Sequence, residues 1–100
     1  MADPRLPNLT VQQLEYLVAA AASPTRAAAA KDLGVTPSAL TQGLAELERR
    51  VGVPLFERKG RQTELRPQAT EVLAHARRVV AETRDLARWA ETRRTGTAGT

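Results

Sequence analysis

The turn at residues 33–37 constrains the fold of this chain most strongly. Its sequence, LGVTP, places a helix stop and a helix start next to each other. Gly34 suits the left-handed residue that commonly ends a helix. Thr36 can cap the next helix, and Pro37 fits that helix's first turn. Two helices joined by so short a glycine-containing turn form a helix-turn-helix.

The segments around this turn also carry helix signals. Thr10 and Gln13 form a capping box, which begins a first helix. Ser23 and Pro24 predict the start of a second, with the serine as cap and the proline as first helical residue. Leu40, Leu44 and Leu47 recur at helical spacing and predict the buried face of a third. The expected helices cover residues 11–22, 26–33 and about 37–51.

Beyond Gly52 the hydrophobic period changes. "VPLFERKGRQTELRP" predicts two short strands, at 55–58 and 63–66, around a basic turn. Such a hairpin after a helix-turn-helix is a wing. Pro67 then begins a long helix that is expected to end near Arg94, and "TGTAGT" has the composition of a flexible linker. We therefore expect a mainly α fold: a winged helix-turn-helix with a two-stranded wing and a long C-terminal linker helix. The expected divisions are a flexible arm at 1–8, the winged domain at 9–66, the linker and dimerisation helix at 67–94 and a flexible tail at 95–100.

Composition excludes several classes of protein. The chain has no Cys and a single histidine, His75, so no metal site, catalytic triad or cofactor site is expected, and no enzyme. No apolar run approaches the roughly 20 residues that span a bilayer, and the N-terminus lacks a signal-peptide core. These features predict a cytoplasmic protein without membrane contact. A net charge of +4 and a pI near 10.6 are compatible with an acidic partner such as nucleic acid, or with an ordinary solvated surface.

The third predicted helix begins with an uncharged polar edge. Acidic residues often occupy a first helical turn, because they complement the positive end of the helix dipole, yet here the acids are held back to Glu46 and Glu48. A helix that enters the major groove reads bases with its N-terminal half, where Gln can read adenine and Ser or Thr can bond either base type. The alternative is that Thr-Pro-Ser is only a good helix cap. The candidate base-reading residues are Thr36, Pro37, Ser38, Thr41 and Gln42.

The predicted wing carries Arg58, Lys59 and Arg61 within four positions. This compact positive tip suits the narrow minor groove or flanking phosphates, although a charged turn is often merely solvated. Arg26, near the start of the second helix, can reach a phosphate with help from that helix's N-terminus. Its alternative is an exposed surface arginine.

The last predicted helix carries an apolar or small seam that steps by 4, 3, 4, 3 and 4 residues, as in a coiled coil. Acidic and basic residues flank the seam, which favours an interhelical contact over a second nucleic-acid surface. Pairing with a second copy would cover the seam and present two reading helices to two half-sites. The alternative is packing against the first helix alone. The predicted dimerisation residues are Val72, Ala76, Val79, Thr83, Leu86 and Ala90.

Taken together, these residues resemble a known family. From about Leu9 to Arg78 the sequence is similar to the N-terminal DNA-binding domain of bacterial LysR-type transcriptional regulators. The sharpest matches are Thr25-Arg26-Ala27-Ala28, Ala39-Leu40, Leu47-Glu48 and "VGVPLFER" from Val51 to Arg58. The resemblance implies binding to double-stranded operator DNA and a linker helix that pairs antiparallel in a homodimer, with a tetramer as an open alternative for a full-length protein. It also implies that the base-reading set faces the major groove, that Arg58 reaches the minor groove and that Arg26 lies near the DNA backbone.

Some residues depart from the family pattern. Pro37 stands where the family often has Gln, which removes one hydrogen-bonding side chain. Gly43 lies inside the reading helix, where Gly costs about 1 kcal/mol relative to Ala, and it either permits close backbone approach or weakens the helix. These departures keep open an alternative function, a protein-interaction module that pairs through the linker helix and binds DNA weakly. Because family members continue into a ligand-sensing domain, we expect a fragment of a longer regulator, the alternative being a naturally short relative.

Overall fold

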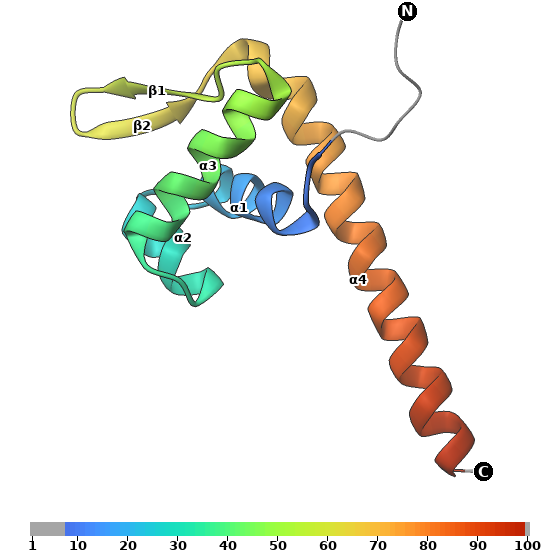
Figure 1. Ribbon diagram of the computed structural model, residues 1–100. Helices are drawn as coiled ribbons and strands as arrows, with labels where there is room; N and C mark the ends of the chain where they lie inside the picture. Colours follow the sequence, from blue (N-terminus) through green and yellow to red (C-terminus); the bar gives the residue numbers. More distant parts are fainter. Residues whose placement is uncertain (1–7, 100) are drawn as a thin grey trace, which may run out of the picture.

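The computed structural model describes residues 8–99, with side chains for residues 8–94. Three helices are followed by an antiparallel two-stranded sheet, a short 3-10 turn and a long helix that projects away from the rest of the molecule (Figure 1). This arrangement confirms the predicted winged helix-turn-helix with a two-stranded wing. The predicted arm lies almost wholly outside the described residues. The elements are α1 (Val11–Ala22), α2 (Arg26–Leu33), α3 (Pro37–Val51), β1 (Phe56–Lys59), β2 (Gln62–Leu65), η1 (Pro67–Ala69) and α4 (Thr70–Gly99).

Side-chain caps define the starts of the first two helices. At α1 the predicted capping box is present: the Thr10 hydroxyl accepts the Gln13 N–H, and the Gln13 side chain accepts the Thr10 N–H, both at 3.1 Å. At α2 the predicted cap is wrong. Thr25, not Ser23, caps this helix, because its hydroxyl accepts the Ala28 N–H at 3.0 Å. Pro24 therefore precedes the cap instead of occupying the first turn.

The turn between α2 and α3 forms as predicted. Gly34 has a φ of +73°, in the left-handed region that favours glycine. Its N–H bonds back to the end of α2, and Val35 N–H reaches the Ala30 carbonyl at 3.0 Å. Thr36 then caps α3 by accepting the Ala39 N–H at 3.0 Å. Helix stop and helix start thus lie two residues apart, which fixes the relation of α2 to α3.

The wing differs from the prediction by one residue. Phe56 pairs with Leu65, and Lys59 pairs with Gln62, so the turn is Gly60-Arg61 instead of Lys59-Gly60-Arg61. Leu55, predicted as a strand residue, lies just before β1 and is buried in the core. It anchors the hairpin to the helices.

Aliphatic side chains build the core. None of the described polar or charged residues is buried, and no described buried side-chain polar atom lacks a hydrogen-bond partner. The leucine face of α3 packs inward as predicted. The largest fully buried side chains are Leu17, Leu40, Leu47 and Leu55.

The long helix α4 requires three corrections. Pro67 begins a 3-10 turn, and the α-helix starts at Thr70. The helix continues to Gly99, so the expected end near Arg94 is wrong; Thr100, the last residue of the expected tail, lies outside the described residues. Ala76 is fully buried in the domain's own core, so it is unavailable for pairing with a second copy. The core-facing residues of this segment are Ala69, Leu73, Ala76 and Val80.

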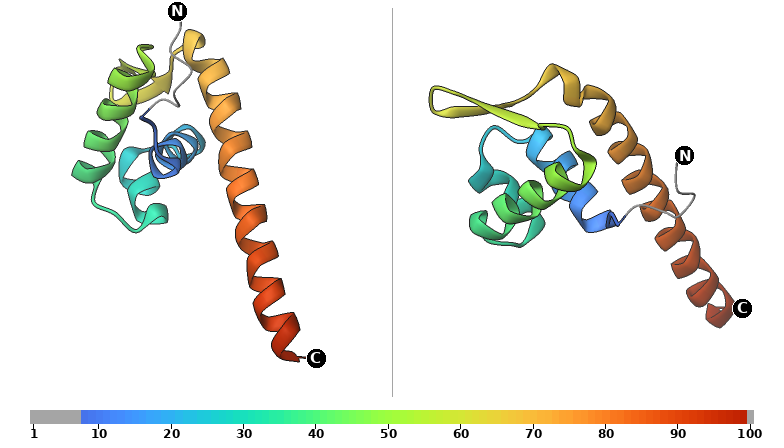
Figure 2. Two further views of the ribbon diagram at one scale, coloured as in Figure 1. Left: turned by 45° about the vertical axis from the view of Figure 1, so that its right-hand side comes forward. Right: turned by 45° about the horizontal axis from the view of Figure 1, so that its top comes forward.

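Only the first part of α4 packs against the domain. It lies beside α1, and the remainder extends away from the other described elements, which it contacts through a single ion pair (Figure 2). Every residue from 81 to 94 is exposed. Arg84 makes one outlying contact, an ion pair of 3.5 Å with Glu15 of α1. The alternative that the whole seam packs against the first helix therefore disagrees with the geometry.

Close packing explains the glycine inside α3. A Cβ atom at Gly43 would lie 2.5 Å from Cδ2 and 2.6 Å from Cε2 of Tyr16, distances that real Cβ atoms do not tolerate. The Tyr16 ring is buried and lies directly against the α3 backbone. Of the two alternatives for Gly43, the structure supports close approach.

We predict that Gly43→Ala lowers the free energy of unfolding by about 1–2 kcal/mol. Overpacking costs about 1–3 kcal/mol and outweighs the gain of about 1 kcal/mol in helix propensity. Urea denaturation followed by circular dichroism measures the change. In a Tyr16→Leu background the same substitution should be neutral or stabilising, because the ring is gone. Stabilisation in the unmodified background would contradict the packing account.

Candidate DNA-binding surface

The predicted base-reading residues share one exposed edge of α3. Thr36, Pro37, Ser38, Thr41 and Gln42 are all exposed, whereas Leu40, Leu44 and Leu47 face the core. The first turn of α3 contains no acidic residue. Small polar side chains therefore surround the positive end of this helix, and a negatively charged partner could approach without facing a carboxylate.

Thr36 also has a structural role. Its hydroxyl oxygen caps α3, so the cap interpretation of Thr-Pro-Ser is correct for this residue. The cap does not use Ser38, Thr41 or Gln42, whose side chains have no hydrogen bond to another described residue. These three residues are available to a partner.

The acids held back in α3 have structural partners. Glu46 pairs with Arg49 and Arg50 at the end of the helix. The hydrogen bond from Arg49 has the largest effect on the pKa of the Glu46 carboxyl, followed by the one from Arg50, and both lower it. Glu48 accepts the backbone N–H of Leu55 at 2.6 Å, where the chain enters the wing. Their position in the second half of α3 is explained by these contacts, and it leaves the N-terminal half uncharged.

The three basic residues of the wing are not equivalent. Lys59 Nζ lies 3.6 Å from a Glu64 carboxylate oxygen and 4.0 Å from one of Glu57. Arg58 and Arg61 are exposed and form no ion pair within the described part of the chain. Lys59 is thus partly neutralised by its own hairpin, and the arginines carry the uncompensated charge of the wing.

Arg26 is half-buried beside the wing and is not a free surface arginine. Its guanidinium carbon lies 4.7 Å from the centre of the Phe56 ring, which is a cation–π distance. Burial lowers the pKa of Arg26, and the nearby Glu48 carboxylate opposes that shift. The group stays charged at neutral pH because an arginine pKa starts so high. Sequence reasoning missed Phe56 and Glu48 as its partners, because both lie more than 20 positions away.

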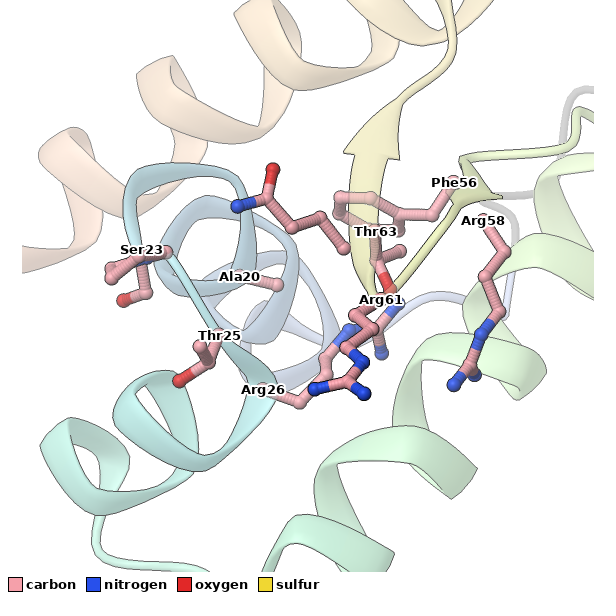
Figure 3. Close-up of a pocket in the computed structure, with 10 residues that line it drawn as sticks. Ala20, Ser23, Thr25, Arg26, Phe56, Arg58, Arg61 and Thr63 are labelled. Carbon is pink, nitrogen blue, oxygen red and sulfur yellow. The ribbon is translucent and has the colours of Figure 1, made fainter.

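Two shallow grooves bring the predicted residues together. One of about 270 Å³ lies between the start of α2 and the wing, and Arg26, Arg58 and Arg61 line it. Figure 3 shows these guanidinium groups beside β1 and β2. The second, about 280 Å³, lies between α3 and the wing, where Thr41 joins Arg26 and Arg58. The helix-turn-helix and the wing both contribute to these two grooves, which share Arg26 and Arg58 and which Lys59 does not line. The carboxylates of Glu48 and Glu57 also line the second groove.

The described residues include neither a candidate metal site nor a candidate membrane span. Its His, Asp and Glu residues form no group that could hold a metal ion. None of the helices in residues 8–99 is both long and apolar enough to cross a membrane. The three helices and the two-stranded hairpin together form a winged helix-turn-helix, a fold that DNA-binding domains use.

Comparison with known sequences identifies the family. The profile of bacterial regulatory helix-turn-helix proteins of the lysR family matches residues 11–70. The transcriptional regulator CbbR of Xanthobacter flavus is 43% identical over an alignment of 76 residues, and the match covers 73% of this chain and 22% of CbbR. The regulator EstR of Acinetobacter baylyi is 40% identical over 83 residues, 83% of this chain and 27% of EstR. The chain belongs to the LysR family and spans about a quarter of the length of these relatives.

Solved structures show the same domain. The DNA-binding domain of CbnR in complex with DNA has a TM-score of 0.70 and 34% identity, and the match covers 90% of this chain and 99% of that one. An OxyR mutant of Corynebacterium glutamicum has a TM-score of 0.80 and 27% identity over 89% of this chain and 28% of its own. This protein is thus a LysR-type helix-turn-helix domain of the kind found in transcriptional regulators, a non-catalytic class, as predicted.

The cap at α3 generates a prediction that needs no DNA. Thr36→Ala should lower the free energy of unfolding by about 1 kcal/mol, because the Ala39 N–H loses its acceptor. Thr36→Ser should keep most of the stability, since its hydroxyl can still accept. The control is Thr41→Ala, an exposed threonine outside the cap, which should change stability by less than about 0.5 kcal/mol. Equal losses at Thr36 and Thr41 would contradict this assignment.

Proposed function

We propose that this chain is a sequence-specific, dimeric reader of double-stranded DNA, in which α3 enters the major groove and the wing reaches the minor groove. The observation that carries the proposal is that Thr41, on the uncharged edge of α3, lines one groove with Arg26 and Arg58, while these two arginines line the other groove with Arg61. The likeness to the CbnR domain, whose structure is a DNA complex, supports DNA as the partner.

The side chains on α3 suit base recognition. Gln42 can bond bidentately to adenine, and the Ser38 and Thr41 hydroxyls can donate to or accept from either base type. Pro37 has no side-chain donor, so its contribution is apolar contact. Thr36 faces the same partner while it holds the start of the helix.

The arginines supply the electrostatic attraction and the orientation. Arg58 has no competing carboxylate among the described residues and can enter a narrow minor groove, where the negative potential is strongest. Arg61 and Arg26 are placed for backbone phosphates. Phosphate contacts fix the register of the protein on the duplex, while the α3 contacts read the sequence.

The far half of α4 is proposed to pair with the same helix of a second copy. Val79 is 39% exposed, and Leu86 and Trp89 are 61% and 60% exposed, so a large apolar surface faces solvent in the described part of the chain. The Trp89 ring has one neighbour there, the Arg93 guanidinium, 5.4 Å from the ring centre. Thr83 and Ala90 lie on the same stripe as Val79 and Leu86. Val72 is half-buried at its start, and Ala76 is excluded by its burial. The proposed contact therefore comprises Val79, Thr83, Leu86 and Ala90, with Val72 and Trp89 at its margins.

The exposed apolar stripe also supports the alternative function, a protein-interaction module that uses α4 and binds DNA only weakly. The dependence of binding affinity on salt concentration distinguishes the two functions. Neutralising phosphates releases counterions, so DNA affinity falls steeply with salt concentration. Association through apolar side chains responds little to salt. The uncompensated arginines favour DNA binding as the primary function.

We predict that affinity for duplex DNA falls linearly on a log–log plot against salt and that Arg58→Ala reduces both the affinity and the slope. The slope should fall by about 0.9 if one phosphate contact is lost. Lys59→Ala is the matched control: it should have the smaller effect, because Lys59 is already paired with Glu64 and Glu57. Fluorescence anisotropy at four salt concentrations measures both quantities. Salt-insensitive binding by the unmodified protein would contradict the proposed function.

The proposed dimer gives a second prediction. Leu86→Asp should raise the dimer dissociation constant at least tenfold, because a carboxylate would be buried in an apolar contact. The control, Ala81→Asp, places the same charge on the opposite, exposed side of α4 and should change little. Sedimentation equilibrium distinguishes the dimer from the 10.8 kDa monomer. Equal effects of the two substitutions, or no association of the unmodified chain, would contradict the assigned stripe.

A further inference from the structure

We propose that Glu48 and Phe56 are positioning residues that set the specificity of DNA binding by fixing the wing and Arg26 relative to α3. This inference rests on the proposed function. Neither residue belongs to the exposed base-reading edge or to the tip of the wing, and both are only partly exposed. Both line the groove between α3 and the wing, together with Arg26 and Arg58.

Glu48 joins the reading helix to the wing through one strong hydrogen bond. Its carboxylate, in the last turns of α3, accepts the Leu55 N–H at 2.6 Å. Hydrogen bonds to an ionised acceptor are shorter and stronger than neutral ones. Leu55 is buried, and its carbonyl accepts the Arg66 N–H at 2.8 Å where the second strand leaves the wing. Both ends of the hairpin are thus tied, through one residue, to the helix that is proposed to read the bases.

Phe56 is the first residue of β1, directly after Leu55, and its ring contacts Arg26. The ring lies under the Arg26 guanidinium at 4.7 Å, and the Phe56 carbonyl accepts Arg66 Nε at 3.1 Å. The Glu48 carboxylate attracts the same guanidinium. An otherwise flexible cation from α2 is therefore held by the wing and by α3 at once, which reduces the conformational entropy lost when it meets a phosphate.

The consequence is a geometric link between the two parts of the proposed interface. While α3 stays in register with the bases, a shift of the wing relative to α3 would move Arg58 away from the minor groove. The same shift would move Arg26 away from the phosphates. Sequence-independent attraction would survive such a shift, because the charges remain. Discrimination among sequences would fall, because it requires base and backbone contacts to form together.

The test compares two duplexes: one enriched from a random pool by the unmodified protein, and one of the same composition with its bases shuffled. The quantity measured is the dissociation constant for the shuffled duplex divided by that for the enriched duplex, at a fixed salt concentration. Glu48→Ala and Phe56→Leu should each lower this ratio at least fivefold in folded protein, with affinity for the shuffled duplex nearly unchanged. Glu48→Gln should retain the ratio within about twofold, because its amide oxygen can still accept the Leu55 N–H. The charge-matched control is Asp32→Asn, at an exposed position near the end of α2.

Hydrogen exchange at the Leu55 amide gives a second readout. Exchange should become faster in Glu48→Ala and stay slow in Glu48→Gln. Folding is checked by circular dichroism, and Phe56→Leu tests the proposal independently if Glu48→Ala does not fold. A retained ratio in the folded alanine and leucine variants would overturn the inference, and so would equal losses in Glu48→Gln and Glu48→Ala. An unmodified protein that does not distinguish the duplexes would instead refute the sequence-specific function itself.

Discussion

Burial of the leucine face of α3 is the constraint on which the rest of this structure depends. Leu40, Leu44 and Leu47 pack into a core built almost wholly from aliphatic side chains. At about 25 cal/mol for each Å² of apolar surface removed from water, one such leucine contributes about 1.5–3 kcal/mol. The helical repeat then leaves the opposite side of α3 to solvent. The same packing that stabilises the domain therefore decides which side chains a DNA duplex could meet.

Charge is arranged around that exposed edge in a consistent way. Carboxylates are used where the chain must be held: Glu46 at the end of α3, Glu48 at the entry to the wing, and Glu57 and Glu64 along the hairpin. Arg58 and Arg61 are left without such partners in the described structure. The uncompensated charge of these two arginines would attract a polyanion towards the wing and the start of α2.

The sequence predicted most of the local structure, because caps, turn residues and hydrophobic periods act over a few positions; the cap of α2, expected at Ser23 and found at Thr25, is an exception. The capping box at Thr10, the turn at Gly34 and the leucine face of α3 were all predictable. Contacts between segments distant in the sequence could not be predicted in this way. The seam on α4 was assigned by spacing alone, and it included Ala76. The structure shows that Ala76 is buried in the domain's core together with Leu73 and Val80. Gly43 could be understood only once Tyr16 was placed beside it.

The same distinction applies to the candidate site. The exposed residues of α3 and the wing arginines followed from the pattern of a helix-turn-helix and a hairpin. The supporting contacts of Arg26 with Phe56 and Glu48 join three elements, and no periodicity in the sequence reports them. The difference between Lys59 and its neighbouring arginines likewise depends on the cross-strand position of Glu64.

Selection of duplexes from a random pool, with the enriched sequences read at two salt concentrations, tests the central claim most directly. A dimer that inserts α3 into the major groove should enrich a two-fold-symmetric motif whose half-sites lie about one helical turn apart. Binding should weaken at the higher salt concentration while the motif stays the same. Salt-sensitive binding without any enriched motif would contradict base reading by α3, and specificity would then have to arise elsewhere.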